Sequence, residues 1–104
     1  MSHPIDRLYH GVHLARAESP PESRTAQLLK DGNPKVAKKV AEEATEVALD
    51  AVVADRDGVI RESADLLYNL MVLWVHMGIT PSEIWAEMDH RESTLGLAGK
   101  MPKS

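Results

Sequence analysis

A run of apolar side chains between Leu66 and Val75 constrains the fold more than any other part of this sequence. At about 100° per residue, these side chains cover nearly the whole circumference of a helix. A helix that is apolar all round must be buried all round. The longest apolar stretch, from Leu66 to Met77, contains Tyr68, Asn69 and His76 and is too short to span a membrane, which takes roughly 20 apolar residues. Since a chain of 104 residues can hardly enclose such a helix alone, we expect a second copy to complete a helical bundle, most simply as a C2 dimer.

The rest of the sequence also predicts helices, because apolar residues recur at three- and four-residue spacing and no alternating segment is long enough for a sheet. Ser23 and the pair Asn33–Pro34 are helix-start signals, and Gly78 sits where a left-handed C-cap is expected. Residues 80–83 form a capping box. The expected helices cover about residues 4–16, 23–29, 33–54, 59–77 and 80–91, with turns at 31–32 and 55–58. We therefore expect one all-α domain over residues 1–104, with a loose tail from 93 to 104.

The composition excludes several classes of protein. The sequence contains no cysteine, which rules out disulfides, zinc–thiolate sites and cysteine nucleophiles and fits a reducing cytoplasm. Its net charge of −4 argues against nonspecific binding to nucleic acid. No basic segment followed by an apolar core opens the sequence, so no secretory signal is predicted. We expect a soluble, cytoplasmic protein that binds neither nucleic acid nor membranes.

Acidic residues gather on the third and fourth expected helices. Glu42, Glu43 and Glu46 fall within an arc of about 100° on one helix, and Glu62 and Asp65 share a face of the next. The short turn between these helices makes them an antiparallel hairpin, in which the two acidic groups lie at comparable distances from the turn. Carboxylates one turn apart on two facing helices suit Mg²⁺, which takes oxygen ligands and shares them with water and phosphate. Such a metal neutralises phosphate oxygens and activates water.

A solvated charged face is the alternative interpretation of the third helix. Lys38–Glu42 and Lys39–Glu43 have the i,i+4 spacing of ordinary surface salt bridges. The fourth helix favours the metal site, because Asp65 lies in an apolar setting and a buried carboxylate must be paired, protonated or bound to metal. A buried hydrogen-bond network is the alternative there. The two helices together favour the metal site.

The same residues carry a resemblance to a known family. Residues 38–46 read KKVAEEATE, and residues 62–68 read ESADLLY. These segments resemble the phosphoribosyl-ATP pyrophosphatases of histidine biosynthesis, which belong to the all-α nucleoside-triphosphate pyrophosphatase superfamily that includes the MazG-type proteins. The signature of that superfamily, ExxE and ExxD on consecutive helices, is matched by Glu43/Glu46 and Glu62/Asp65. The likeness extends from about residue 25 to residue 91.

This resemblance implies a MazG-like helical bundle, a homodimer or dimer of dimers, and Mg²⁺-dependent cleavage of an α–β phosphoanhydride, with Mn²⁺ as a substitute metal. The most similar activity converts phosphoribosyl-ATP to phosphoribosyl-AMP and pyrophosphate. By the same likeness, the metal ligands are Glu43, Glu46, Glu62 and Asp65. Glu42 is then a further ligand, an orienting group or the base for water, so the candidate catalytic residues are Glu42 and Glu43.

The resemblance also implies substrate-binding residues. Lys38 and Lys39 would face the phosphates. From its own position, one turn after Asp65 on the same helix face, Asn69 is expected to reach a substrate oxygen or a metal-ligating side chain with its amide. Two positions depart from the family pattern, which commonly has Gly where Ala41 stands and His where Asn69 stands. These departures leave open a house-cleaning pyrophosphatase for noncanonical nucleoside triphosphates. A catalytically inactive module for dimerisation or nucleotide binding is the alternative from another class.

Overall fold

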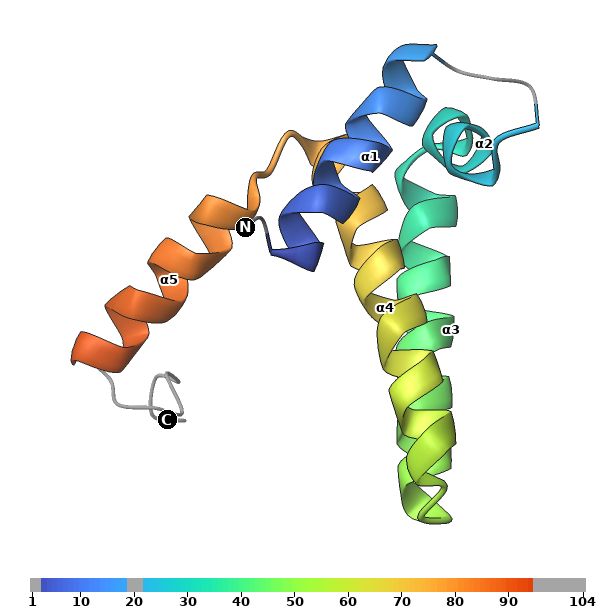
Figure 1. Ribbon diagram of the computed structural model, residues 1–104, viewed down its shortest axis with the longest axis vertical. Coiled ribbons are helices and arrows are strands. Elements are labelled where there is room, and N and C mark those ends of the chain that lie inside the picture. Colours follow the sequence, from blue (N-terminus) through green and yellow to red (C-terminus); the bar gives the residue numbers. More distant parts are fainter. Residues whose placement is uncertain (1–2, 19–21, 95–104) are drawn as a thin grey trace.

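The computed structural model describes residues 3–18 and 22–94, and in this part of the chain it contains five helices and no strand (Figure 1). These helices are α1 (Pro4–Glu18), α2 (Arg24–Asp31), α3 (Asn33–Val52), α4 (Arg56–Met77) and α5 (Pro81–Thr94). The two longest helices, α3 and α4, lie side by side as an antiparallel hairpin, while α1 and α2 pack across one of its ends and α5 leads away from it. The all-α prediction is confirmed. Residues 95–104 of the expected tail lie outside the described residues, and the two residues before them belong to α5.

Local capping chemistry explains several of the observed helix ends. The Ser23 hydroxyl accepts a hydrogen bond from the backbone N–H of Ala26 at 3.1 Å, as an N-cap should. The backbone N–H of Thr80 donates to the Glu83 carboxylate at 2.7 Å, which confirms the predicted capping box. Gly78 ends α4 in the left-handed conformation, with φ 72° and ψ 26°.

Three predicted boundaries need correction. Asn33 is the first residue of α3 rather than its cap, because Gly32 takes the cap position with φ 88°. The helix α4 begins at Arg56, since Asp55 caps it by accepting a hydrogen bond from the N–H of Gly58 at 3.0 Å. The segment 55–58, predicted as a turn, is therefore mostly helix. The helix α5 continues to Thr94, three residues beyond its predicted end.

The core lies where α1 and α2 meet the hairpin. Its buried apolar side chains form one cluster: Val12, Leu28, Val36, Met71, Val72 and Val75. Side chains of α1 also bond to the backbone at the end of α4 and just beyond it. The Tyr9 hydroxyl donates to the carbonyl oxygen of Ile79 at 2.7 Å, and the Arg16 guanidinium donates to that of Val75 at 3.2 Å. These contacts hold one end of the hairpin rigidly.

The other end of the hairpin keeps much apolar surface uncovered within one chain. Leu49 is 61% exposed, Val52 is 83% exposed, and Ile60 is 53% exposed. On α4 itself, Leu67 remains 40% exposed, whereas Met71 is fully buried. Burial of α4 on every side is thus not achieved by the single chain. Within the described residues, no helix is long and apolar enough to cross a membrane.

Candidate metal and phosphate site

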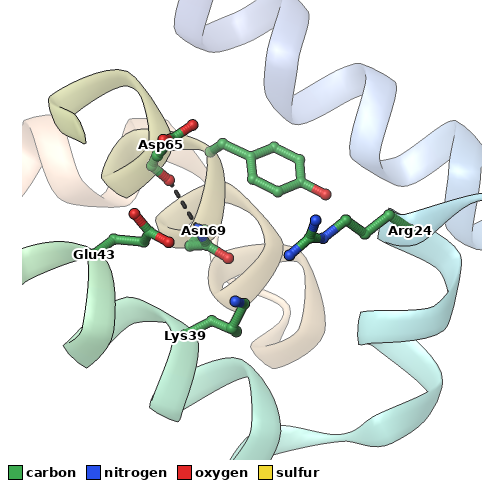
Figure 2. A pocket seen from close by; sticks show the side chains of 6 residues that line it. Arg24, Lys39, Glu43, Asp65 and Asn69 are labelled. Atoms are coloured by element: carbon green, nitrogen blue, oxygen red, sulfur yellow. Dashed lines mark hydrogen bonds between the residues drawn. The ribbon is translucent and has the colours of Figure 1, made fainter. Parts of the chain in front are cut away.

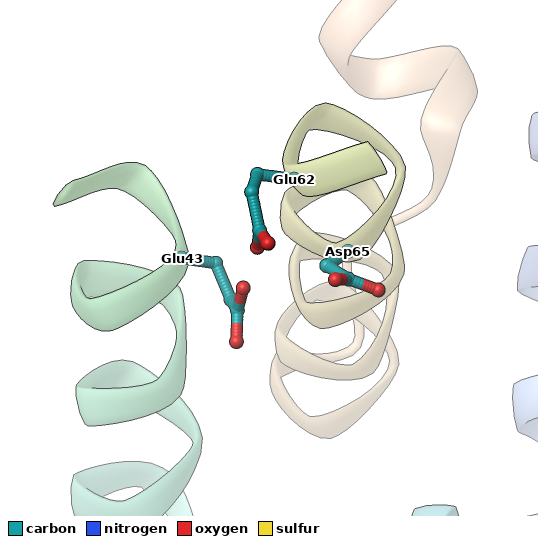
Figure 3. A group of neighbouring side chains, drawn as sticks. All are labelled: Glu43, Glu62 and Asp65. Carbon is teal, nitrogen blue, oxygen red and sulfur yellow. The ribbon is translucent and has the colours of Figure 1, made fainter. Parts of the chain in front are cut away.

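Three carboxylates meet between the two helices of the hairpin. Glu43 extends from α3, and Glu62 and Asp65 extend from α4 (Figure 3). Each offers an oxygen atom, and these atoms lie within 4.8 Å of one another. The arrangement follows from local geometry, because Glu62 and Asp65 are one turn apart on α4 and the antiparallel hairpin brings Glu43 to the same level. We call these three residues the carboxylate cluster.

The carboxylate cluster concentrates negative charge that the protein does not neutralise within the described residues. The pKa of the Glu62 carboxyl is raised to about 7. The largest cause is hydrogen bonding to Glu46, followed by burial, by hydrogen bonding to Glu43 and by the negative charges of Glu46 and Asp65. The Oε2 atom of Glu43 is buried and has no hydrogen-bond partner in the described part of the chain. Crowded carboxylate oxygens that lack donors are the ligand set that a hard divalent cation requires. The cluster therefore fits a metal ion.

The structure reverses part of the predicted burial on α4. Asp65 is exposed, although the sequence predicts a buried carboxylate, whereas Asn69 is only 4% exposed. The reason is that Asn69 lies one turn closer to the core, while Asp65 belongs to the less covered part of the hairpin. The Asn69 amide nitrogen donates to the backbone carbonyl of Asp65 at 2.9 Å. Its Oδ1 atom is buried and accepts no hydrogen bond from any described residue.

A pocket of about 220 Å³ adjoins the carboxylate cluster (Figure 2). It is lined by Arg24, Lys39, Glu43, Asp65, Tyr68 and Asn69. Two of these residues are cations from α2 and α3, and two are members of the carboxylate cluster. A pocket with carboxylates for a metal and cations for anionic oxygens has the groups that phosphoryl chemistry uses.

The other predicted site residues lie beside this pocket rather than in it. Glu46 is exposed and falls outside the group of oxygens within 4.8 Å, yet it is close enough to raise the pKa of Glu62. Glu42 pairs with Lys38 at 4.0 Å and with Lys39 at 3.5 Å. The expected Lys39–Glu43 pair is therefore replaced by a Lys39–Glu42 pair. A second hollow of about 430 Å³ shares no residue with the first and is lined by Lys38, Ala41, Glu42, Thr45 and Glu46.

Two pocket residues were not anticipated from the sequence. Tyr68 closes the ESADLLY segment and shares the α4 surface with Asp65, so its spacing offered a signal. Arg24 offered none, because nothing in its neighbourhood along the chain indicates that α2 packs beside the acidic residues. The two residues are linked through Thr25, whose hydroxyl lies 2.6 Å from the hydroxyl of Tyr68.

Comparisons with known proteins agree on one family. A family model described as phosphoribosyl-ATP pyrophosphohydrolase matches residues 6–92. The chain is 57% identical to phosphoribosyl-ATP pyrophosphatase 2 of Rhodopseudomonas palustris over 104 residues, which is 100% of this chain and 79% of the relative. It is 56% identical to the protein of the same name from Bradyrhizobium diazoefficiens, with 100% and 78% covered. It is also 45% identical over 96 residues to phosphoribosyl-ATP pyrophosphatase of Azospirillum brasilense, with 92% and 86% covered.

Proposed function

Because the chain belongs to the phosphoribosyl-ATP pyrophosphohydrolase family, we propose that it hydrolyses phosphoribosyl-ATP to phosphoribosyl-AMP and pyrophosphate at the pocket beside the carboxylate cluster. The enzyme is thus a phosphoanhydride hydrolase of histidine biosynthesis. One observation carries the choice of site: three carboxylate oxygens lie within 4.8 Å of one another and open onto a pocket that also contains two cations. The family's pathway and the cysteine-free sequence support a cytoplasmic enzyme.

The carboxylate cluster would hold Mg²⁺, with Mn²⁺ as a substitute. Glu43, Glu62 and Asp65 would be its ligands. Glu46, whose carboxylate lies within hydrogen-bond distance of Glu62, would be a fourth ligand. When bound, the metal supplies neutralisation of phosphate oxygens and acidification of a water molecule. Since the pKa of Glu62 is raised to about 7, this carboxyl is partly protonated near neutral pH, and as a metal ligand it would release that proton to solvent.

The glutamates divide the remaining work by their surroundings. The unpartnered Oε2 of Glu43 is available to accept a hydrogen bond from the attacking water and to draw its proton away. Glu42 is engaged with Lys38 and Lys39, so we assign it the positioning of Lys39 rather than contact with water. Lys39, which lines the pocket and is 21% exposed in its side chain, then faces a phosphate oxygen. Lys38 lies in the second hollow, where it would meet only a phosphate that extends beyond the pocket.

Assembly into a homodimer, or a dimer of dimers, is part of the proposal. The free end of the hairpin leaves Leu49, Val52 and Ile60 more than half exposed. Neighbouring apolar side chains this exposed favour association with a second copy, because burial of apolar surface is the main driving force of obligate dimers. A partner hairpin packed there would also cover Leu67 and bring more surface close to the exposed Asp65.

Pyrophosphate release is the direct test. Purified protein should release pyrophosphate from phosphoribosyl-ATP in the presence of Mg²⁺ and release none when the metal is chelated. A panel of canonical and noncanonical nucleoside triphosphates should be cleaved with a much lower kcat/KM. Preference for a noncanonical triphosphate would favour the house-cleaning alternative. Absence of turnover on every substrate would favour the inactive module.

A further inference from the structure

The pocket at the carboxylate cluster is too small for a whole nucleotide. Its volume is about 220 Å³, whereas pockets that enclose small-molecule ligands usually measure roughly 300–1,000 Å³. It therefore receives one part of the substrate, and the remainder extends beyond it. The substrate of the proposed function has two phosphate-bearing parts: the triphosphate chain, which is cleaved, and a ribose 5-phosphate group attached to the base, which simple nucleoside triphosphates lack.

The two ends of the pocket differ in chemistry. Glu43 and Asp65 form the end that belongs to the carboxylate cluster. Arg24 approaches from α2 on the opposite side, with Asn69 between them (Figure 2). No described residue forms an ion pair with Arg24, in contrast to Lys39, which is held by Glu42 at 3.5 Å. The guanidinium of Arg24 is thus available to an anion, and arginine binds phosphate by two parallel hydrogen bonds.

The buried Asn69 amide supplies a second, independent indication of a ligand. The residue is 4% exposed, its amide nitrogen is occupied by the carbonyl of Asp65, and its Oδ1 has no partner among the described residues. An unsatisfied buried acceptor costs free energy unless a donor arrives. A ribose hydroxyl is such a donor, while a phosphate oxygen is not. The pocket therefore offers an acceptor for a hydroxyl and a cation for a phosphate.

The helix α2 is fixed in place at the residue next to Arg24. Ser23 caps the helix, and the Thr25 hydroxyl lies 2.6 Å from the Tyr68 hydroxyl on α4. Tyr68 itself lines the pocket, and in the sequence it lies between Asp65 and Asn69. The Thr25–Tyr68 hydrogen bond thus ties the backbone that carries Arg24 to the helix that carries the carboxylates, and it sets the distance between the two ends of the pocket.

Resting on the proposed function, we propose that the Arg24 end of this pocket binds the ribose 5-phosphate group of phosphoribosyl-ATP, with Arg24 on its phosphate and Asn69 Oδ1 on a ribose hydroxyl. Arg24 is then the residue that distinguishes phosphoribosyl-ATP from simple nucleoside triphosphates, and Thr25 is a positioning residue that acts through Tyr68. The triphosphate chain lies along the carboxylate cluster and Lys39. Recognition of the group that is not cleaved adds binding energy to ground state and transition state alike, so its loss raises KM more than it lowers kcat.

The test compares two ligands that differ by this group alone. Phosphoribosyl-AMP and AMP are titrated into the Mg²⁺-loaded protein by calorimetry, using wild type, Arg24→Gln and, as a matched control, Lys30→Gln, which removes an exposed cation from the same helix. Wild type should bind phosphoribosyl-AMP more tightly than AMP. Arg24→Gln should weaken phosphoribosyl-AMP binding by roughly 10–100-fold, the worth of a charged bidentate contact, and leave AMP binding unchanged. Lys30→Gln should change neither.

Kinetics separates this proposal from the proposed function. Arg24→Gln should raise the KM for phosphoribosyl-ATP by a similar factor with kcat reduced less than threefold, and Thr25→Val should raise KM in the same direction by less. The site assignment is overturned if wild type cleaves phosphoribosyl-ATP but Arg24→Gln keeps its affinity for phosphoribosyl-AMP, or loses affinity for AMP equally. A wild-type protein that does not cleave phosphoribosyl-ATP would instead contradict the proposed function itself.

Discussion

Replacement of Glu43 by glutamine should change activity and stability in opposite directions. Glutamine keeps the shape of the side chain but removes one charge from the carboxylate cluster. An open-site metal contributes several kcal/mol of transition-state stabilisation. If the loss of one ligand removes ~3–4 kcal/mol of this transition-state stabilisation, kcat/KM falls by roughly 10²–10³-fold. We therefore expect Glu43→Gln to be nearly inactive on phosphoribosyl-ATP.

The same replacement should stabilise the metal-free protein. The Oε2 atom of Glu43 is buried, has no hydrogen-bond partner among the described residues and lies beside two other carboxylates. An amide removes one of these crowded negative charges and offers N–H donors to its neighbours, which is worth about 1–3 kcal/mol. In a domain of this size, each kcal/mol shifts Tm by roughly 4–8 °C. The Tm measured in EDTA should therefore rise by at least about 4 °C, while the increase in Tm that Mg²⁺ produces should largely vanish.

Differential scanning fluorimetry with EDTA or Mg²⁺, together with the pyrophosphate-release assay, measures both effects. Glu42→Gln is the matched control, because this neighbour on α3 faces Lys38 and Lys39 instead of the carboxylate cluster. It should lower activity by less than about tenfold, as expected for the loss of two partly exposed ion pairs, and should not raise the metal-free Tm. A Glu43→Gln protein with near-normal turnover, or with a lower Tm in EDTA, would refute the assignment of Glu43 as an unsatisfied metal ligand.

Three further predictions follow from other residues. Because the pKa of Glu62 rises from 4.5 to about 7 on folding, its contribution to the stability of the metal-free protein is complete below pH 4.5 and is lost as the pH rises through 7. Binding of Mg²⁺ should accordingly be weaker below pH 7 and should release protons. Calorimetry in buffers of different ionisation enthalpy measures this proton release, which Glu62→Gln should abolish. Asn69→His should change the ratio of kcat/KM between phosphoribosyl-ATP and simple nucleoside triphosphates by more than it changes Mg²⁺ affinity, because imidazole replaces the buried Oδ1 acceptor. An unchanged ratio would show that Asn69 is a packing residue. Wild type should sediment as a dimer or larger at micromolar concentration, and Leu49→Asp should dissociate it and lower its helicity, since Leu49 is 61% exposed within one chain. Leu14→Asp, at 49% exposure on α1, serves as the control, and a well-folded wild-type monomer would contradict the dimer.

The sequence alone determined the features that depend on neighbours along the chain. The all-α fold, the capping box at Thr80 and the C-cap at Gly78 follow from hydrogen bonds between residues three to five positions apart. The carboxylate pair on α4 follows in the same way from its i,i+3 spacing. The segments KKVAEEATE and ESADLLY were also sufficient to identify the family, which the comparisons confirm. The assignment of Glu43, Glu46, Glu62 and Asp65 as metal ligands stays a prediction.

The tertiary structure decided everything that depends on which surface faces which neighbour. Helical periodicity gives the angle of a side chain around its own axis, but the packing of the hairpin selects Glu43 for the carboxylate cluster and leaves Glu42 to the lysines. The core covers only one end of α4, so Asn69 is buried while Asp65, one turn away, is exposed. Arg24 enters the pocket because α2 packs beside the hairpin, a contact between residues more than 40 positions apart that no local pattern encodes.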